Sequence, residues 1–141
     1  MALTPETFEV GSEVEDVVIV DAQPESAMTW RIDYATGRIG GYIDGSEALR
    51  QYIRKAIATA RNRYIIYDGD YGSELEDLIG MDLTTSLIET EIPRLVREAI
   101  AYDDRIEDVS SIEVTRMDSD IHIAVTVVTF SGEQITEGVT I

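Results

Sequence analysis

The side chains that could carry chemistry in this sequence are mainly carboxylates. Among 141 residues there are 28 Asp and Glu, one histidine and no cysteine. One histidine without cysteine cannot build the usual zinc site, and thiolate catalysis is excluded. The sequence also lacks a Gly-x-Ser-x-Gly elbow, a phosphate loop and a dinucleotide fingerprint. His122 lies between Ile121 and Ile123 in a predicted strand, where a structural histidine is far more common than a base.

Two kinds of carboxylate chemistry need to be weighed. A glycosidase needs two carboxyl groups roughly 5–9.5 Å apart, one kept protonated by an apolar pocket. With 28 acids some pair meets any distance test, and no residue pattern marks one of them as buried. Asp68-Gly69-Asp70 resembles the start of a calcium loop but lacks the EF-hand spacing and its closing glutamate, which favours a polar turn. We therefore predict no catalytic residue, cofactor or metal site, and keep a lysozyme-like glycosidase as the alternative.

The more informative charged group is Arg105, which follows the last predicted helix in the run Tyr102-Asp103-Asp104-Arg105-Ile106. An arginine among acids at a helix-to-strand junction can form a local ion pair. It can also present its guanidinium fork to another chain. The residues favour the local pair and leave the second interpretation open.

The overall charge narrows the classes of partner. The formal net charge is −17, so the chain repels phosphate backbones and anionic lipid surfaces. We therefore predict neither a nucleic acid nor a membrane as partner. No apolar run approaches the roughly 20 residues of a membrane span, and the N-terminus lacks signal-peptide features. Together with the absence of cysteine, this predicts a protein made in a reducing cytoplasm.

Residues 1–29 differ from the rest of the chain. They hold seven acids and no Lys or Arg, with one apolar run at Val17–Val20. This composition predicts an extended arm that orders against another surface, or a frayed terminus without a role. Residues 30–141 are then expected to form a single domain.

The remaining patterns predict an α+β fold. A hairpin is expected at 30–43 and an amphipathic helix after Asp44, which begins a sequence typical of a capping box. Further along the chain we expect a short buried strand at 64–67, a two-turn helix at 73–80, a helix over 88–100 and strands at 111–116, 121–130 and 134–141. Pro93 suggests that the second long helix starts near Thr90 or kinks at the proline. The hairpin and the C-terminal strands are expected to share one small mixed sheet, packed with about three helices.

The last two strands differ in pattern. Residues 121–130 are apolar on both faces, which indicates a central strand covered on each side. Residues 134–141 are the better candidate for an edge, with Glu133 and Glu137 guarding against stray pairing. Val139 and Ile141 are therefore candidate partner-binding residues, and an ordinary closed hairpin is the alternative.

Several separated motifs resemble one known group of proteins. The runs Thr29–Asp33, Arg38–Gly41, Ile57–Tyr67, Tyr71–Gly80 and Ala99–Ile106 are similar to those of XkdS-like baseplate proteins from phage, prophage and bacteriocin tail modules. The resemblance covers about residues 30–130. That group resembles the wider gene-25-like sheath-initiator family, which has a Thr-Arg-x-Gly-Glu stretch and a Glu-Pro-Arg triplet. Thr59 and Arg61 occupy the first motif without its Gly-Glu, and Asp103-Asp104-Arg105 occupies the second.

This resemblance implies a structural role in a virion or tail particle assembled in the host bacterial cytoplasm. It implies six copies in a baseplate ring, in contact with the tail sheath protein, baseplate wedge proteins and the tail tube or tube initiator. The chain would initiate the sheath by offering strands to it, with a tube-side baseplate adaptor as a further alternative. On the same basis the candidate partner-binding residues include Thr59, Arg61, Asp103 and Arg105.

Overall fold

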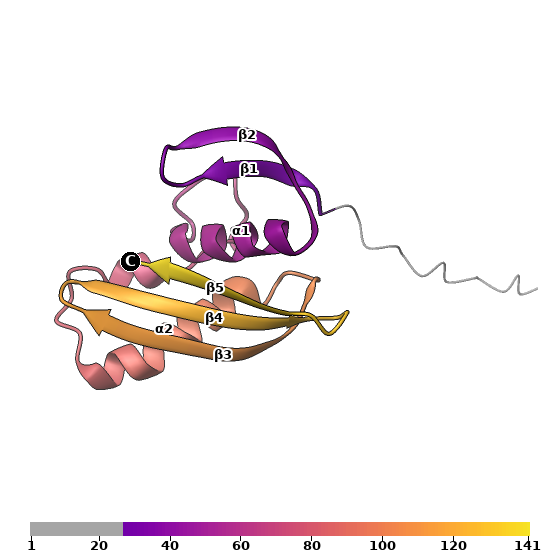
Figure 1. Cartoon of the computed structure of the whole chain (residues 1–141). Helices are drawn as coiled ribbons and strands as arrows, with labels where there is room; N and C mark the ends of the chain where they lie inside the picture. The colour runs from indigo at the N-terminus through magenta and orange to yellow at the C-terminus, as the bar shows by residue number, and fades with distance from the viewer. Residues whose placement is uncertain (1–26) are drawn as a thin grey trace, which may run out of the picture.

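The computed structural model describes residues 27–141, so the expected arm at 1–29 lies outside the described residues except for its last three. The elements follow in the order β1 (Thr29–Asp33), β2 (Arg38–Ile43), α1 (Gly45–Ala58), the 3-10 helix η1 (Leu75–Leu78), α2 (Thr85–Ile100), β3 (Ile106–Met117), β4 (Asp120–Thr129) and β5 (Gln134–Thr140). Helix α1 lies between the β1–β2 hairpin and the β3–β4–β5 sheet (Figure 1).

The predicted N-terminal hairpin is confirmed. Its turn is held by Asp33, whose carboxylate accepts hydrogen bonds from the backbone of Ala35 and from the backbone and hydroxyl of Thr36. These bonds, the Thr36 hydroxyl first, lower the pKa of Asp33. Gly37 supplies the positive φ of 69° that the turn requires.

The capping prediction for α1 is half correct. Asp44 is the N-cap, and its side chain accepts a hydrogen bond from the Gly45 N–H at 2.7 Å. The carboxylate of Glu47 binds Arg31 of β1 at 2.9 Å, so it ties the hairpin to the helix. Gln51 adds a second tie, because its side chain accepts from the Ile32 N–H and donates to the Trp30 carbonyl.

Helix α2 starts earlier than predicted. Thr84 caps it through a hydrogen bond from the Leu87 N–H, and Pro93 lies inside the helix. The proline removes one backbone donor, but the buried stripe continues across it and packing outweighs that loss. The buried residues of α2 are Ile88, Ile92, Leu95, Val96, Ala99 and Ile100.

Two predicted elements between the helices are wrong. Residues 64–67 are not a buried strand, because they belong to an exposed loop that makes its own turn bond from the Tyr67 N–H to the Tyr64 carbonyl. The expected helix at 73–80 is reduced to the four residues of η1. The described residues therefore contain two α-helices instead of about three.

The strands form two antiparallel sheets and not one mixed sheet. β1 pairs with β2, and β3, β4 and β5 form a separate sheet in that order. Helix α1 separates the two sheets because it binds β1 through Gln51 and β5 through Arg50 and Arg54. The core lies between α1, α2 and one face of the three-stranded sheet. The α+β class is confirmed.

Strand β4 is central, as predicted, but covered on one face only. Ile123, Val125 and Val127 are at most 1% exposed. The opposite face is half-buried and includes His122, whose Nδ1 lies 2.8 Å from the Thr140 hydroxyl of β5. Within residues 27–141, no helix combines the length and apolar character that a bilayer crossing requires.

Candidate partner-binding surfaces

The direction of the backbone groups along β5 decides which residues can face a partner. Ile141 exchanges two backbone hydrogen bonds with Ile121 of β4, at 2.9 and 3.0 Å, and the Thr129 N–H bonds to the Glu133 carbonyl. Because bonding alternates along an antiparallel pair, the odd-numbered residues of β5 bond to β4. The outward N–H and C=O groups belong to the residues in between, which are Gln134, Thr136, Gly138 and Thr140.

Val139 and Ile141, the two residues chosen from sequence, therefore do not offer their own backbone groups to a partner. Val139 is 7% exposed and part of the core. Residue patterns could not reveal this, because alternation shows that two sets of backbone groups exist without showing which set faces β4.

Helix α1 already holds two of the outward carbonyls of β5. Arg50 donates from Nη1 to the Thr136 carbonyl at 2.6 Å, and Arg54 donates from Nη2 to the Gly138 carbonyl at 3.3 Å. Arg54 also pairs with Glu137 at 2.7 Å. Glu137 was expected to keep stray strands off the edge of β5 by its charge. In the structure it pairs with Arg54, which lies over that edge. Among the described residues, no side chain is seen on the outward N–H groups of Thr136, Gly138 or Thr140.

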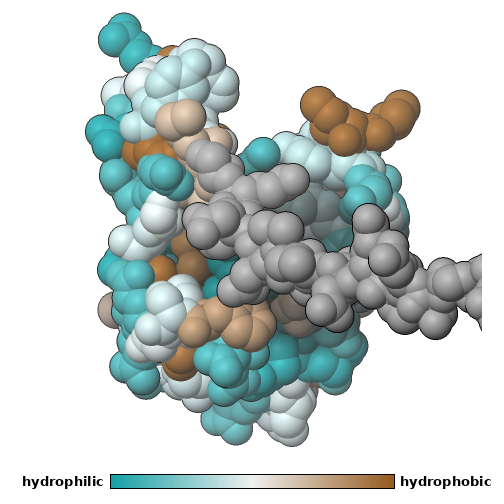
Figure 2. Space-filling view, turned by 90° about the vertical axis from the view of Figure 1, so that its right-hand side faces the viewer, coloured by the Kyte–Doolittle hydropathy of each residue, from teal (hydrophilic) through white to brown (hydrophobic). Residues whose placement is uncertain are grey.

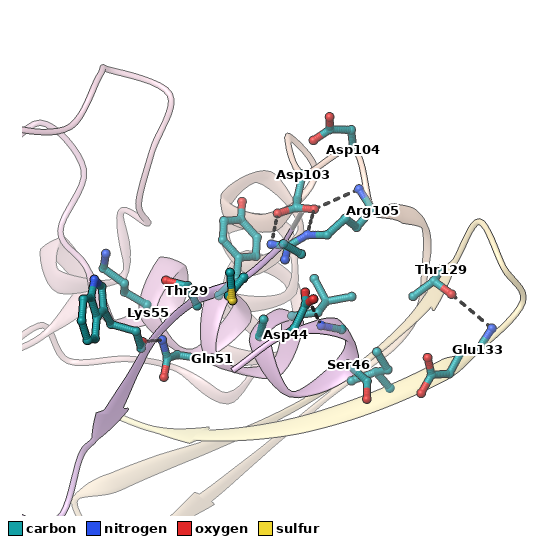
Figure 3. A pocket seen from close by; sticks show the side chains of 18 of the residues that line it. Thr29, Asp44, Ser46, Gln51, Lys55, Asp103, Asp104, Arg105, Thr129 and Glu133 are labelled. Atoms are coloured by element: carbon teal, nitrogen blue, oxygen red, sulfur yellow. Dashed lines mark hydrogen bonds and ion pairs between the residues drawn. The ribbon is translucent and has the colours of Figure 1, made fainter. Parts of the chain in front are cut away.

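Arg105 and Asp103 lie together at the α2–β3 junction (Figure 3). Asp103 Oδ1 accepts from Arg105 Nε at 2.8 Å and Oδ2 accepts from Nη2 at 2.6 Å, so the guanidinium fork is used within the chain. The Asp103 carboxylate raises the pKa of Arg105, and burial, with Asp103 adding to it, raises the pKa of Tyr52 to about 12. Arg105 Nη1 is not part of this pair.

These residues line a groove of about 1060 Å³ between the hairpin, the start of α1, the α2–β3 junction and the β4–β5 turn. Its polar groups are largely engaged already. Both Asp103 oxygens bind Arg105, Asp44 caps α1, and Thr129 accepts from the Glu133 N–H. Within residues 27–141 no three metal-ligating side chains gather. The side chains of Asp104 and Glu133 also line the groove.

Thr59 and Arg61 stand at the base of the loop that follows α1. Thr59 donates its hydroxyl to the Lys55 carbonyl at 2.6 Å, and its own carbonyl accepts from the Ser73 N–H at 2.8 Å. Arg61 binds the Gly72 carbonyl through Nε and Nη2 and reaches Glu74 through Nη1. Both residues therefore close the loop over positions 60–73.

Substitution of Gly72 tests whether the closed base of this loop contributes to the stability of the chain. Its φ is +99°, and a Cβ atom there would lie 2.7 Å from the Thr59 carbonyl oxygen. We expect Gly72→Ala to lower the free energy of unfolding by about 2–4 kcal/mol, because backbone strain and a backbone clash add. Gly40→Ala is the matched control, since its Cβ would meet nothing within 4 Å. Urea denaturation of the two variants measures the difference, and equal stabilities would contradict the account.

Comparison with known proteins adds the family. The profile of the family described as contractile injection system sheath initiator matches residues 28–132, a stretch that includes Thr59, Arg61, Asp103 and Arg105 and ends before β5. The phage-like element PBSX protein XkdS of Bacillus subtilis is 39% identical over 134 residues, covering 94% of this chain and 92% of that protein.

A solved structure from Geobacter sulfurreducens, described as a tail lysozyme, shares the fold. Its TM-score is 0.62 at 18% identity, over 72% of this chain and 95% of that one. At this identity the likeness shows the fold alone. The family profile and the XkdS relative each span more than two thirds of the chain, so the chain belongs to the contractile injection system sheath initiator family.

Proposed function

We propose that this chain joins the baseplate of a contractile tail to its first sheath ring by accepting an extended strand at the outer edge of β5. The observation that carries the proposal is the row of outward N–H groups at Thr136, Gly138 and Thr140, on an edge strand of a sheath initiator family member. In strand addition, backbone hydrogen bonds supply the affinity. The incoming strand replaces Arg50 and Arg54 with its own backbone donors at the Thr136 and Gly138 carbonyls.

The same proposal covers the assembly. The partners are the tail sheath protein, baseplate wedge proteins and the tail tube or tube initiator, with six copies in a ring within the tail particle, assembled in the host cytoplasm. The unit that makes these contacts is residues 30–141. Family membership supports this, and a net charge of −17 favours partners with basic faces.

The partner-binding residues chosen from sequence take two different parts in the proposal. Arg105 makes a direct contact through Nη1, while Asp103 holds its side chain in place. Thr59 and Arg61 fix the loop after α1, and Val139 and Ile141 hold β5 in register with β4.

The proposed role is structural and not catalytic. The description of the Geobacter protein as a lysozyme applies to that protein, and the groove carboxylate of Asp103 is occupied by Arg105. We expect purified protein to release no fragments from peptidoglycan. Turnover that disappears in a carboxylate variant would favour the glycosidase alternative.

Particles assembled without this chain test the proposal. We expect baseplates and tubes but few sheathed tails by electron microscopy, restored by the wild-type chain. A tube-side adaptor gives a different result, because its loss would stop the tubes themselves. Normal sheath on particles that lack the chain would contradict the proposal.

A further inference from the structure

The loop between α1 and η1 carries the most exposed apolar side chains of the described residues. Ile65 is 105% exposed and Ile66 is 85% exposed, next to Tyr64 at 50%. A strongly hydrophobic projection stands clear of the surface in the space-filling view (Figure 2), in keeping with these exposures. Adjacent isoleucines held fully in water are unfavourable for a soluble chain unless a partner covers them.

The loop that carries Ile65 and Ile66 is firmly built. Its base is closed by a bridge between Ala60 and Ser73, and the Ser73 hydroxyl, in a residue only 2% exposed, donates to the Ile57 carbonyl at 2.6 Å. Arg61 adds two bonds to the Gly72 carbonyl. A framework of this kind keeps the tip in one position, which lowers the entropy lost when a partner binds.

Aromatic rings support the tip from below. Tyr67 stacks on Tyr71 with ring centroids 4.4 Å apart, and Tyr71 meets Tyr52 of α1 edge-on at 6.3 Å. Lys55 lies over both Tyr67 and Tyr71, at 5.0 and 5.7 Å. These contacts anchor the flanking tyrosines to α1 and leave the two isoleucines facing outward.

The charges around the tip indicate which partner fits it. Arg61 pairs with Glu74, and Arg63 pairs with Glu76, so both of these arginines are neutralised, and Lys55 is engaged over the Tyr67 and Tyr71 rings. The remaining acids of this segment, Asp68, Asp70 and Asp77, are exposed and have no ion-pair partner among the described residues. The exposed surface of this loop is therefore apolar at Ile65 and Ile66 and acidic at the neighbouring aspartates.

We propose that Ile65 and Ile66 dock into an apolar socket, flanked by Lys or Arg, on another protein of the same particle. This rests on the proposed function, because it assumes that the chain is a particle component. A second copy of the chain fits less well, since two chains of charge −17 repel each other. An anionic lipid surface is disfavoured for the same reason.

The test uses particles purified from cells that lack this chain, with labelled chain added back and its incorporation measured. The tip variant is Ile65→Ser with Ile66→Ser, and the matched control is Ile79→Ser with Met81→Ser, which are 67% and 60% exposed in the wild type. We expect the tip variant to incorporate at least about tenfold more weakly, since two buried isoleucines contribute strongly to an interface. The control should bind as wild type, with equal melting temperatures for all three proteins.

A second variant tests the contribution of the acidic residues next to the tip. Asp68→Asn with Asp70→Asn should weaken incorporation and reduce its dependence on salt, because charge attraction is screened by ions. Equal binding of the wild-type chain and the tip variant would overturn the inference while leaving the proposed function intact. Wild-type chain that does not incorporate at all would instead count against the proposed function.

Two further measurements on the wild-type chain and the tip variant test the other partners, a second copy of the chain and a lipid surface. Self-association that is concentration-dependent and lost in the tip variant would overturn the proposal in favour of a second copy. Binding of wild-type chain, but not of the tip variant, to neutral phosphatidylcholine vesicles would overturn it in favour of lipid.

Discussion

Gly138→Pro is expected to give folded chains that enter baseplates but recruit little sheath. Gly138 points its N–H away from β4, so proline there removes an outward donor and leaves the β4–β5 pairing intact. A missing hydrogen bond and a blocked approach of the partner strand cost about 1–3 kcal/mol, so the proportion of sheathed tails should fall about fivefold or more. Electron microscopy of the particles measures that proportion.

Two control variants are compared with Gly138→Pro. Gly138→Ala keeps the donor, and its Cβ meets nothing within 4 Å, so it should support sheath as wild type does. Val139→Pro removes a donor that bonds to Ile123 within the chain and should destabilise the protein itself. Sheath that forms normally on Gly138→Pro baseplates would show that the docking edge lies elsewhere, for example on β3.

Arg105→Ala is expected to have two effects, one on the monomer and one on assembly. Asp103 has a side chain that is 9% exposed and would lose both of its bonds to the guanidinium. A carboxylate left buried without its partner should lower the free energy of unfolding by about 2–3 kcal/mol. Baseplate assembly should fail as well, if Arg105 Nη1 binds a neighbouring chain. Urea denaturation measures the first effect.

The double variant Asp103→Ala with Arg105→Ala separates the two effects. It removes the pair without leaving an unpaired charge, so most of the monomer's stability should return. Under the proposal this stable double variant still fails to assemble baseplates. Normal assembly would mean that Arg105 acts only within its own chain.

The residues predicted those parts of the fold that depend on local periodicity. The amphipathic stripe predicted α1, and the β-branched alternation predicted β4 and β5, whereas the first half of β3 was not predicted. Predictions that depended on tertiary packing were wrong. The run at 64–67 has the composition of a buried strand, but it pairs with no strand and lies in an exposed loop. The start of α2 was misplaced because burial of its stripe outweighs the cost of Pro93.

The candidate site was predictable only in part. The acids around Arg105 favoured a local ion pair without indicating which acid accepts it, and the structure shows that this acid is Asp103. The contacts of Arg50 and Arg54 with the β5 carbonyls could not be predicted, because nothing local shows that α1 lies along β5. Truncation after Gly132 would not test the edge, because it would remove the fully buried Ile135 and disrupt the core.

A reconstruction of the assembled particle tests the central claim most directly. We expect this chain between the baseplate and the first sheath ring, with an extended sheath strand hydrogen-bonded to Thr136, Gly138 and Thr140 and with Arg50 and Arg54 displaced from the β5 carbonyls. A chain located away from the sheath, or a β5 edge still covered by both arginines in the sheathed particle, would contradict the account.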